Sequence, residues 1–161
     1  MTCQILSLRD QPQHLTTIAE WIHRQWWSET DTPIGYIERW LNTHLGESGF
    51  PATFVAILDS EVAGSVSLHE TEADDRPTYR PYLGALFVKP DNRGYGFGTA
   101  LVRAVETHAS QLGYPAIYLN AAGALTSLPA RLARYRARLW LQAAQCHAAY
   151  AGVAGRPPGL A

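Results

Sequence analysis

The chain has 161 residues and a mass of 17.7 kDa, with 47% hydrophobic and 17% charged residues and a formal net charge of −1. This length and composition indicate one globular domain with a full core and exclude a disordered chain. No apolar run is long enough to span a membrane, the N-terminus lacks a signal-peptide pattern and the near-neutral charge does not favour nucleic-acid binding, so we expect a cytoplasmic protein without membrane or nucleic-acid partners.

The cysteine content and the charge distribution indicate which kinds of site and substrate to expect. Cys3 and Cys146 are the two cysteines, and their wide separation indicates neither a disulfide framework nor a zinc site, so no metal is expected. All 14 acidic residues lie at or before Glu106, whereas the last 55 residues contain five arginines and no acid. The acidic first part of the chain is compatible with a cationic, amine-bearing substrate.

The first half of the chain alternates between strand and helix patterns. Residues 4–8 read as a short strand. Apolar residues at helical spacing then predict two helices, one on each side of the break at residues 31–33: Leu15, Ile18, Ile22 and Trp26 in the first, and Ile37, Trp40, Leu41 and Leu45 in the second. Strands over 52–58 and 62–68 are predicted to form a hairpin through residues 59–61. The polar, proline-broken segment 69–81 is predicted to be a surface loop.

The second half begins with an apolar, bulky run over 82–88, which predicts a buried strand ended by Pro90. A helix pattern follows, with Gly113 where a C-terminal cap belongs, and residues 116–120 predict another strand. The apolar residues of the helix pattern are Leu101, Val102, Val105, Ala109 and Leu112. A strand, a helix and a second strand in this order require a parallel, right-handed crossover.

Three glycines separate this strand from this helix. Gly94, Gly96 and Gly98 allow the backbone to approach a ligand closely, and the free amides of a helix start attract phosphate. Arg93 adds a positive charge at the edge of the same turn. A P-loop is excluded because no Lys-Ser or Lys-Thr follows the last glycine, and a dinucleotide fingerprint is excluded by the Gly-x-Gly-x-Gly spacing and by the lack of any acid after Glu106.

The same residues resemble the acetyl-CoA motif of the GNAT superfamily of N-acetyltransferases, whose core pattern is Arg/Gln-x-x-Gly-x-Gly/Ala. Arg93, Gly96 and Gly98 fill the three positions, and Val88-x-Pro90 precedes them as in the family. The resemblance implies a single α/β domain over 1–161, with a mixed, mostly antiparallel central sheet flanked by helices. It covers a core of about residues 3–125 and leaves an atypical tail of about 126–161.

The resemblance also implies a reaction, in which acetyl passes from acetyl-CoA to a primary amine of a small or medium cationic acceptor by direct attack in a ternary complex. Aminoglycosides and polyamines are acceptor classes that suit the acidic segment 70–75, and a homodimer is compatible with the family. The pantetheine is expected along the edge of one strand, splayed from the next, with the amide of Phe87 or Val88 facing the thioester oxygen. The expected coenzyme-binding residues are Leu86, Phe87, Val88, Arg93, Gly94, Tyr95, Gly96, Phe97, Gly98, Thr99 and Asn120.

The proton acceptor is not identified by this pattern. Gly84 stands where many relatives carry a glutamate, so Glu70 and Glu72 are the next candidate bases, directly or through a water, with a solvated loop carboxylate as the alternative. His69 is a further candidate, and a structural role is its alternative. Asp74 and Asp75 are expected to attract a cationic substrate, and Trp27 and Tyr36 are candidates for the wall of the acceptor site. A non-catalytic acyl-CoA-binding domain is the alternative function.

The tail departs from the family pattern Ala-x-x-Leu-Tyr-x-x-x-Gly-Phe. Pro129 stands where the tyrosine belongs, which in many relatives protonates the leaving thiolate, and Ala133 stands for the glycine. Three interpretations stay open: an amphipathic helix that begins near Ser127, the product of a reading-frame slip, and a polyanion-binding segment that uses the arginines.

Overall fold

The computed structural model of the protein describes residues 3–70 and 80–119. It contains a five-stranded sheet in the order β1-β2-β3-β4-β5. The strands are β1 Cys3–Ser7, β2 Ala52–Leu58, β3 Glu61–His69, β4 Tyr82–Val88 and β5 Tyr118–Leu119. Neighbours from β1 to β4 are antiparallel and β4 and β5 are parallel, which confirms the expected mixed sheet.

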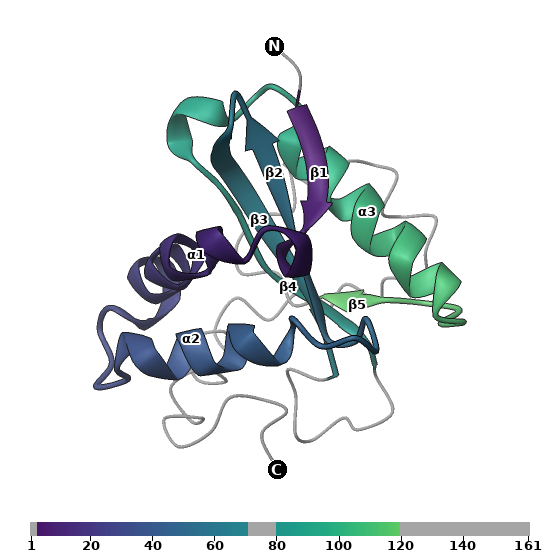
Figure 1. Cartoon of the computed structure of the whole chain (residues 1–161), viewed down its shortest axis with the longest axis horizontal. Helices are drawn as coiled ribbons and strands as arrows, with labels where there is room; N and C mark the ends of the chain where they lie inside the picture. Colours follow the sequence, from purple (N-terminus) through teal and green to yellow (C-terminus); the bar gives the residue numbers. More distant parts are fainter. Residues whose placement is uncertain (1–2, 71–79, 120–161) are drawn as a thin grey trace.

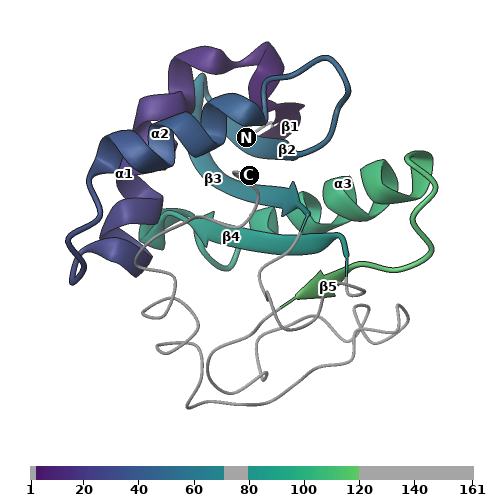
Figure 2. The ribbon, with the colours of Figure 1, turned by 90° about the horizontal axis from the view of Figure 1, so that it is seen from below.

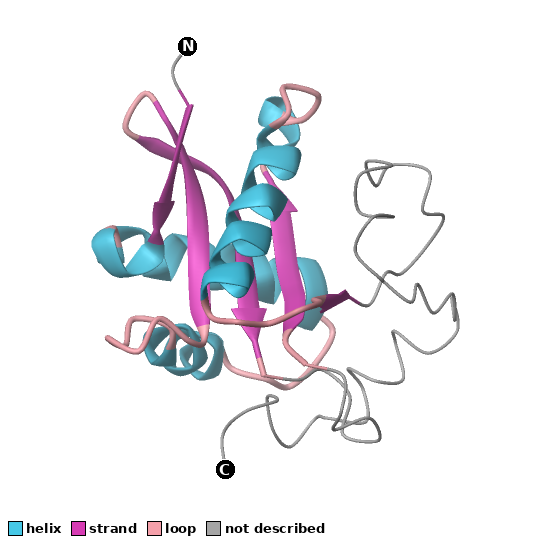
Figure 3. Cartoon of the chain, turned by 90° about the vertical axis from the view of Figure 1, so that its right-hand side faces the viewer, coloured by secondary structure: helices cyan, strands magenta, loops and turns pink. Residues whose placement is uncertain are grey.

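Helices cover both faces of the sheet. Helix α3, Phe97–Gln111, lies on one face, and α1, Leu15–Ile22, and α2, Ile34–Thr43, pack together on the other (Figures 1 and 2). Figure 3 views the molecule from the α3 side, with one helix in front of the strands and the other helices behind them. Each helix layer has its own cluster of buried side chains against the sheet, one under α3 and one under α1 and α2. The sheet is therefore buried on both sides.

Several boundaries differ from those expected from the sequence. The first helix ends at Ile22, and residues His23–Trp27 continue it as one wider π turn. The hairpin turns on Asp59 and Ser60 alone, both with positive φ, so Glu61 already belongs to β3 and pairs with Leu58. Strand β5 begins at Tyr118, two residues later than expected, and residue 120 of the expected strand lies outside the described residues.

Helix α3 is bounded by a left-handed glycine at each end. Gly96 is its N-cap with φ +85°, and Gly113 follows its C-cap with φ +87°. The N–H of Tyr114 donates to the carbonyl of Ala109 at 3.0 Å and the N–H of Gly113 to that of Ser110 at 3.0 Å, which is the Schellman arrangement. The expected glycine cap is confirmed. Leu112, expected on the buried stripe, is instead 38% exposed at the cap itself.

In the described ranges, 3–70 and 80–119, no helix combines the length and apolar character needed to cross a membrane. The atypical tail of about 126–161, with its three interpretations, lies outside these ranges.

Candidate functional site

The described strand β5 pairs with only part of one edge of β4. Within the described residues β5 pairs with β4 only at Tyr82 and Leu83, so β4 from Gly84 to Val88 carries no strand on that side. On the other side the N–H of Lys89 donates to the carbonyl of Ala63 at 2.9 Å. Because backbone direction alternates along a strand, the N–H and C=O of Val88 point away from β3 and toward the open edge.

This alternation bears on the expected thioester contact. By the same alternation the amide of Phe87 points to β3, and that of Leu86 points to the open edge. Of the two amides expected to face the thioester, those of Phe87 and Val88, only that of Val88 therefore points to the open edge. The Phe87 ring packs against Trp21 of α1, with centroids 5.1 Å apart. Its side chain therefore belongs to the contact between sheet and helix.

A bulge bends β4 beside this edge. The pairing of β3 with β4 shifts between Ser65, opposite Phe87, and Ser67, opposite Gly84. Ala85 lies in the shift with φ +50°, a left-handed conformation that costs an L-residue about 1–2 kcal/mol. Such bulges bend a strand and redirect its side chains. Strain of this kind is typical of ligand sites, and here it lies at the point where β4 leaves β5.

The turn after β4 leads directly into α3. A short 3-10 turn, Pro90–Asn92, follows the strand, and Gly94 then has φ +83° and Gly96 φ +85°. A Cβ atom at either position would meet no atom within 4 Å, so the backbone there faces open space. At Gly98 an added Cβ would lie 3.8 Å from Val88, an ordinary contact, which agrees with Gly or Ala at this position of the motif.

The turn offers a set of free amides. Within the described part of the chain, none of the N–H groups of residues 94–99 donates a hydrogen bond, because the first helical bond runs from Ala100 to Gly96, at 3.0 Å. The amide of Arg93 is engaged with Pro90 at 3.2 Å. Its side chain is exposed and donates through Nε to the carbonyl of Val88 at 3.0 Å. Of the expected coenzyme-binding residues from Arg93 to Thr99, all except Arg93 therefore have a free amide within the described residues.

The face under α1 and α2 carries buried polar side chains. His44 Nδ1 lies 2.7 Å from Thr53 Oγ1, which lies 2.8 Å from Ser67 Oγ. All three are at most 2% exposed. Burial, and then the charge of nearby His69, lower the pKa of His44 to about 3, so its imidazole is neutral at ordinary pH.

This chain of hydrogen bonds ends beside the place of the missing glutamate, because Ser67 is the register partner of Gly84. Ser65 lies two residues away on the same face, and its Oγ is buried without a hydrogen-bond partner in the described residues. None of these residues was identified from the sequence. The alternation of Ser65, Val66, Ser67 and Leu68 was a signal for them, but it ordinarily indicates a strand with one face in water.

The candidate base Glu70 lies apart from the bulge. Its Oε1 accepts from Arg80 Nη1 at 2.8 Å, and both side chains are about half exposed, 49% for Glu70 and 58% for Arg80. The preceding residue, His69, pairs with Tyr82, three residues and about 10 Å along β4 from Ala85. His69 itself is 4% exposed, and its ring packs on Trp40 at 5.6 Å, which favours its structural alternative.

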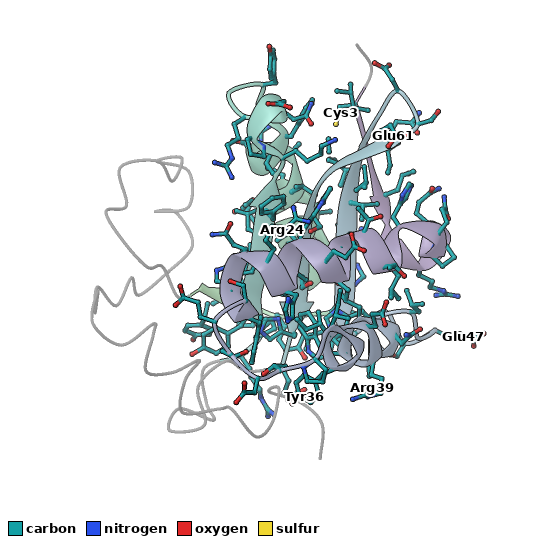
Figure 4. All side chains as sticks on the ribbon, turned by 90° about the vertical axis from the view of Figure 1, so that its left-hand side faces the viewer. Cys3, Arg24, Tyr36, Arg39, Glu47 and Glu61 are labelled. Carbon is teal, nitrogen blue, oxygen red and sulfur yellow. The ribbon has the colours of Figure 1, made fainter. Side chains whose placement is uncertain are left out.

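The two described candidates for the acceptor site, Trp27 and Tyr36, have different environments. Trp27 is 6% exposed and belongs to the cluster under α1 and α2. Tyr36 is partly exposed on α2, with the Arg39 guanidinium 6.0 Å from its ring centroid. Figure 4 shows Tyr36 and Arg39 at one end of the molecule, with Cys3 and Glu61 at the other. Glu72, Asp74, Asp75 and Asn120 lie outside the described residues.

The arrangement suits an extended ligand that ends in phosphate. Free amides at a helix N-terminus bind a diphosphate, and the open edge of β4 offers amide and carbonyl groups to an amide-bearing chain laid beside it. The left-handed glycines themselves add no side chain to the approach to these amides. Coenzyme A is a ligand of this shape. The edge of β4 suits its pantetheine, and the free amides that follow along the chain suit its diphosphate.

Comparisons with known proteins agree with this geometry. A family model described as the acetyltransferase (GNAT) family matches residues 12–131. A comparison with curated proteins gave no match. Among solved structures, a protein described as an acetyltransferase of the GNAT family from Xanthomonas campestris pv. campestris is 25% identical, with 83% of this chain and 84% of that chain covered and a TM-score of 0.57.

Two further solved structures share the fold at lower identity. One, from Clostridium acetobutylicum, is described as an acetyltransferase with acetyl-CoA; it is 15% identical, with 74% of this chain and 81% of that one covered and a TM-score of 0.59. The other is an aminoglycoside N-acetyltransferase in complex with CoA, 18% identical, with 75% and 78% covered and a TM-score of 0.59. The family model spans most of the sequence, and the chain belongs to the acetyltransferase (GNAT) family.

Proposed function

We propose that this protein transfers acetyl from acetyl-CoA to a primary amine of a small or medium cationic acceptor, by direct attack in a ternary complex. The observation that carries the proposal is the row of free amides at residues 94–99 directly beyond the unpaired edge of β4. In this reading the amides of residues 94–99 bind the diphosphate and the amide of Val88 donates to the thioester oxygen. When bound, acetyl-CoA supplies an activated acyl group.

Two observations support the proposed class of acceptor: the charge of one sequence segment and the acceptors named for structural neighbours. The sequence segment that contains Glu72, Asp74 and Asp75 is acidic, which favours a cationic acceptor. Aminoglycosides and a sugar phosphate are the acceptors named for structural neighbours, among them glucosamine-6-phosphate N-acetyltransferase from Arabidopsis thaliana. We therefore propose aminoglycosides and polyamines as the first acceptors to test, in a cytoplasmic enzyme that works as a monomer or a homodimer.

The alternative is an acyl-CoA-binding protein without turnover. It is favoured by one observation, namely that β4 carries Gly84 where a glutamate is expected, while Glu70 is paired with Arg80 at the surface. Glu72 and water-mediated transfer remain the proposed routes for the amine proton in the enzyme.

Calorimetry with acetyl-CoA, followed by a thiol-release assay with an amine panel, tests both proposals. We expect saturable binding and amine-dependent release of free CoA. Binding without release for any amine would favour the alternative, and the absence of binding at millimolar acetyl-CoA would contradict both.

A further inference from the structure

Tyr95 is unusual among the large apolar and aromatic side chains of the described residues. It is 65% exposed, whereas the two other exposed ones, Ile34 and Leu112, reach 37% and 38%. Its position is also special, because it lies between Gly94 and Gly96, within the row of free amides. An exposed aromatic ring beside a row of free amides is a combination that suits a nucleotide, which offers a flat base and a phosphate.

The ring of Tyr95 is supported from one side. Its centroid lies 6.3 Å from that of Phe97, and the two rings are 30° from parallel. Phe97 is 8% exposed and belongs to the core cluster under α3, so it gives Tyr95 a fixed backing. Aromatic pairs in this distance range attract each other weakly, and the pair limits the conformations open to Tyr95.

The other side of the ring is available. With two thirds of the side chain exposed and one face turned to Phe97, the second face is left to the solvent. No atom lies within 4 Å of the positions that Cβ atoms would take at Gly94 and Gly96, so the neighbouring backbone leaves room for a flat ligand. A backed ring with a free face is a stacking platform, and stacking of a base on such a ring is worth about 1–3 kcal/mol.

We propose that Tyr95 is the platform on which the adenine base of the coenzyme stacks, and that the Tyr95–Phe97 pair thereby sets the preference of this protein for nucleotide-bearing thioesters. The proposal rests on the proposed function, since the diphosphate held by the amides of residues 94–99 brings the adenosine next to Tyr95. Lys89 and Arg93, which flank the turn, are cations within the same segment for the additional phosphate of the ribose.

The test compares ligands that do and do not carry the base. Acetyl-CoA, acetyl-dephospho-CoA and acetyl-4′-phosphopantetheine are titrated into the wild-type protein, Tyr95→Ala and the matched control Tyr95→Phe. We expect Tyr95→Ala to weaken both adenine-bearing ligands about tenfold and to leave acetyl-4′-phosphopantetheine within twofold, while Tyr95→Phe binds all three like the wild type. Proton NMR should show upfield shifts of the adenine H2 and H8 signals with the wild type and not with Tyr95→Ala.

Three outcomes overturn the proposal. An equal loss for all three ligands would mean that Tyr95 only maintains the turn, and no loss for any would mean that the base lies elsewhere. A loss confined to acetyl-CoA would assign the effect to the ribose phosphate instead of the base. The proposed function fails separately, since in that case the wild-type protein binds none of the three.

Discussion

At the scale of single residues, the three glycines of the motif have two different tasks. Gly96 must adopt a left-handed conformation at the start of α3, whereas Gly98 lies inside the helix with only Val88 nearby. A left-handed conformation is costly for any residue with a Cβ, while alanine in a helix is favourable. The two positions therefore provide a matched pair of substitutions.

We predict that Gly96→Ala lowers the free energy of unfolding by about 1–2 kcal/mol and weakens acetyl-CoA binding about tenfold, because the strained residue displaces the amides next to it. Gly98→Ala should keep both quantities within about 1 kcal/mol of the wild type, since its Cβ makes an ordinary contact. Urea unfolding and calorimetry measure the two effects. Equal behaviour of the two variants would contradict the separate tasks.

His44 makes the stability of the fold depend on pH. Its pKa is about 3 in the folded protein, against an ordinary value of 6.5, because of burial and then of His69. Below pH 6.5 the unfolded chain takes up a proton that the folded protein refuses until about pH 3, so stability falls as the pH is lowered through this window. Above pH 6.5 His44 is neutral in both the folded and the unfolded chain, so this loss of stability is absent there.

We predict that the wild-type protein loses about 2 kcal/mol more stability than His44→Asn between pH 7 and pH 5. Asparagine retains a group able to bond Thr53 and does not titrate. Urea unfolding at the two pH values measures the difference. If the two proteins lost equal stability, the imidazole would have an ordinary pKa in the folded protein.

At the scale of elements, β3, β4 and α3 meet at Gly64. A Cβ atom there would lie 2.7 Å from the carbonyl oxygen of Phe87 and 3.2 Å from both Leu101 and Val88. The nearest of these atoms is backbone and cannot rotate away. The lack of a side chain at Gly64 is thus what allows α3 to lie close to the strands whose ends form the site.

Gly64→Ala is expected to lower the free energy of unfolding by about 1–3 kcal/mol, because an overpacked core must shift its backbone. Since the shift acts on β4 between Phe87 and Val88, acetyl-CoA binding should weaken as well. Gly35→Ala, whose Cβ meets only the far end of Arg39 at 3.6 Å, serves as the control and should be at least as stable as the wild type. A neutral Gly64→Ala would show that β4 and α3 can shift away from the added methyl group without cost.

The sequence predicts elements well where periodicity and caps agree, and less well where tertiary packing decides. The hairpin, α3 with its glycine cap and β4 with its terminal proline are confirmed, since each has a local signal. The bulge at Ala85 has no such signal, because the left-handed residue is an alanine beside a glycine. The expected helical turn around Trp26 is a π turn, a change that hydrophobic spacing does not encode.

At the scale of the whole molecule, the residues of the proposed coenzyme site could be predicted from the sequence, whereas the buried polar group under α1 and α2 could not. Gly94, Gly96 and Gly98 are proposed to act through their own backbone, so local sequence is enough to identify them. Ser65, Ser67 and Thr53 instead become neighbours by strand pairing, and their burial depends on two helices that cover an apparently solvent-facing side. Long-range pairing of this kind is not visible in a single sequence.

Helix α3 has 15 residues, and a glycine in the left-handed conformation stands at its N-cap and another directly after its C-cap. An inserted or deleted residue inside it would rotate everything beyond that point by about 100°. Either the apolar stripe would then miss the sheet, or the free amides at the start of the helix would change direction. Related proteins should consequently keep the length of this helix constant, and their insertions and deletions should lie in the loops.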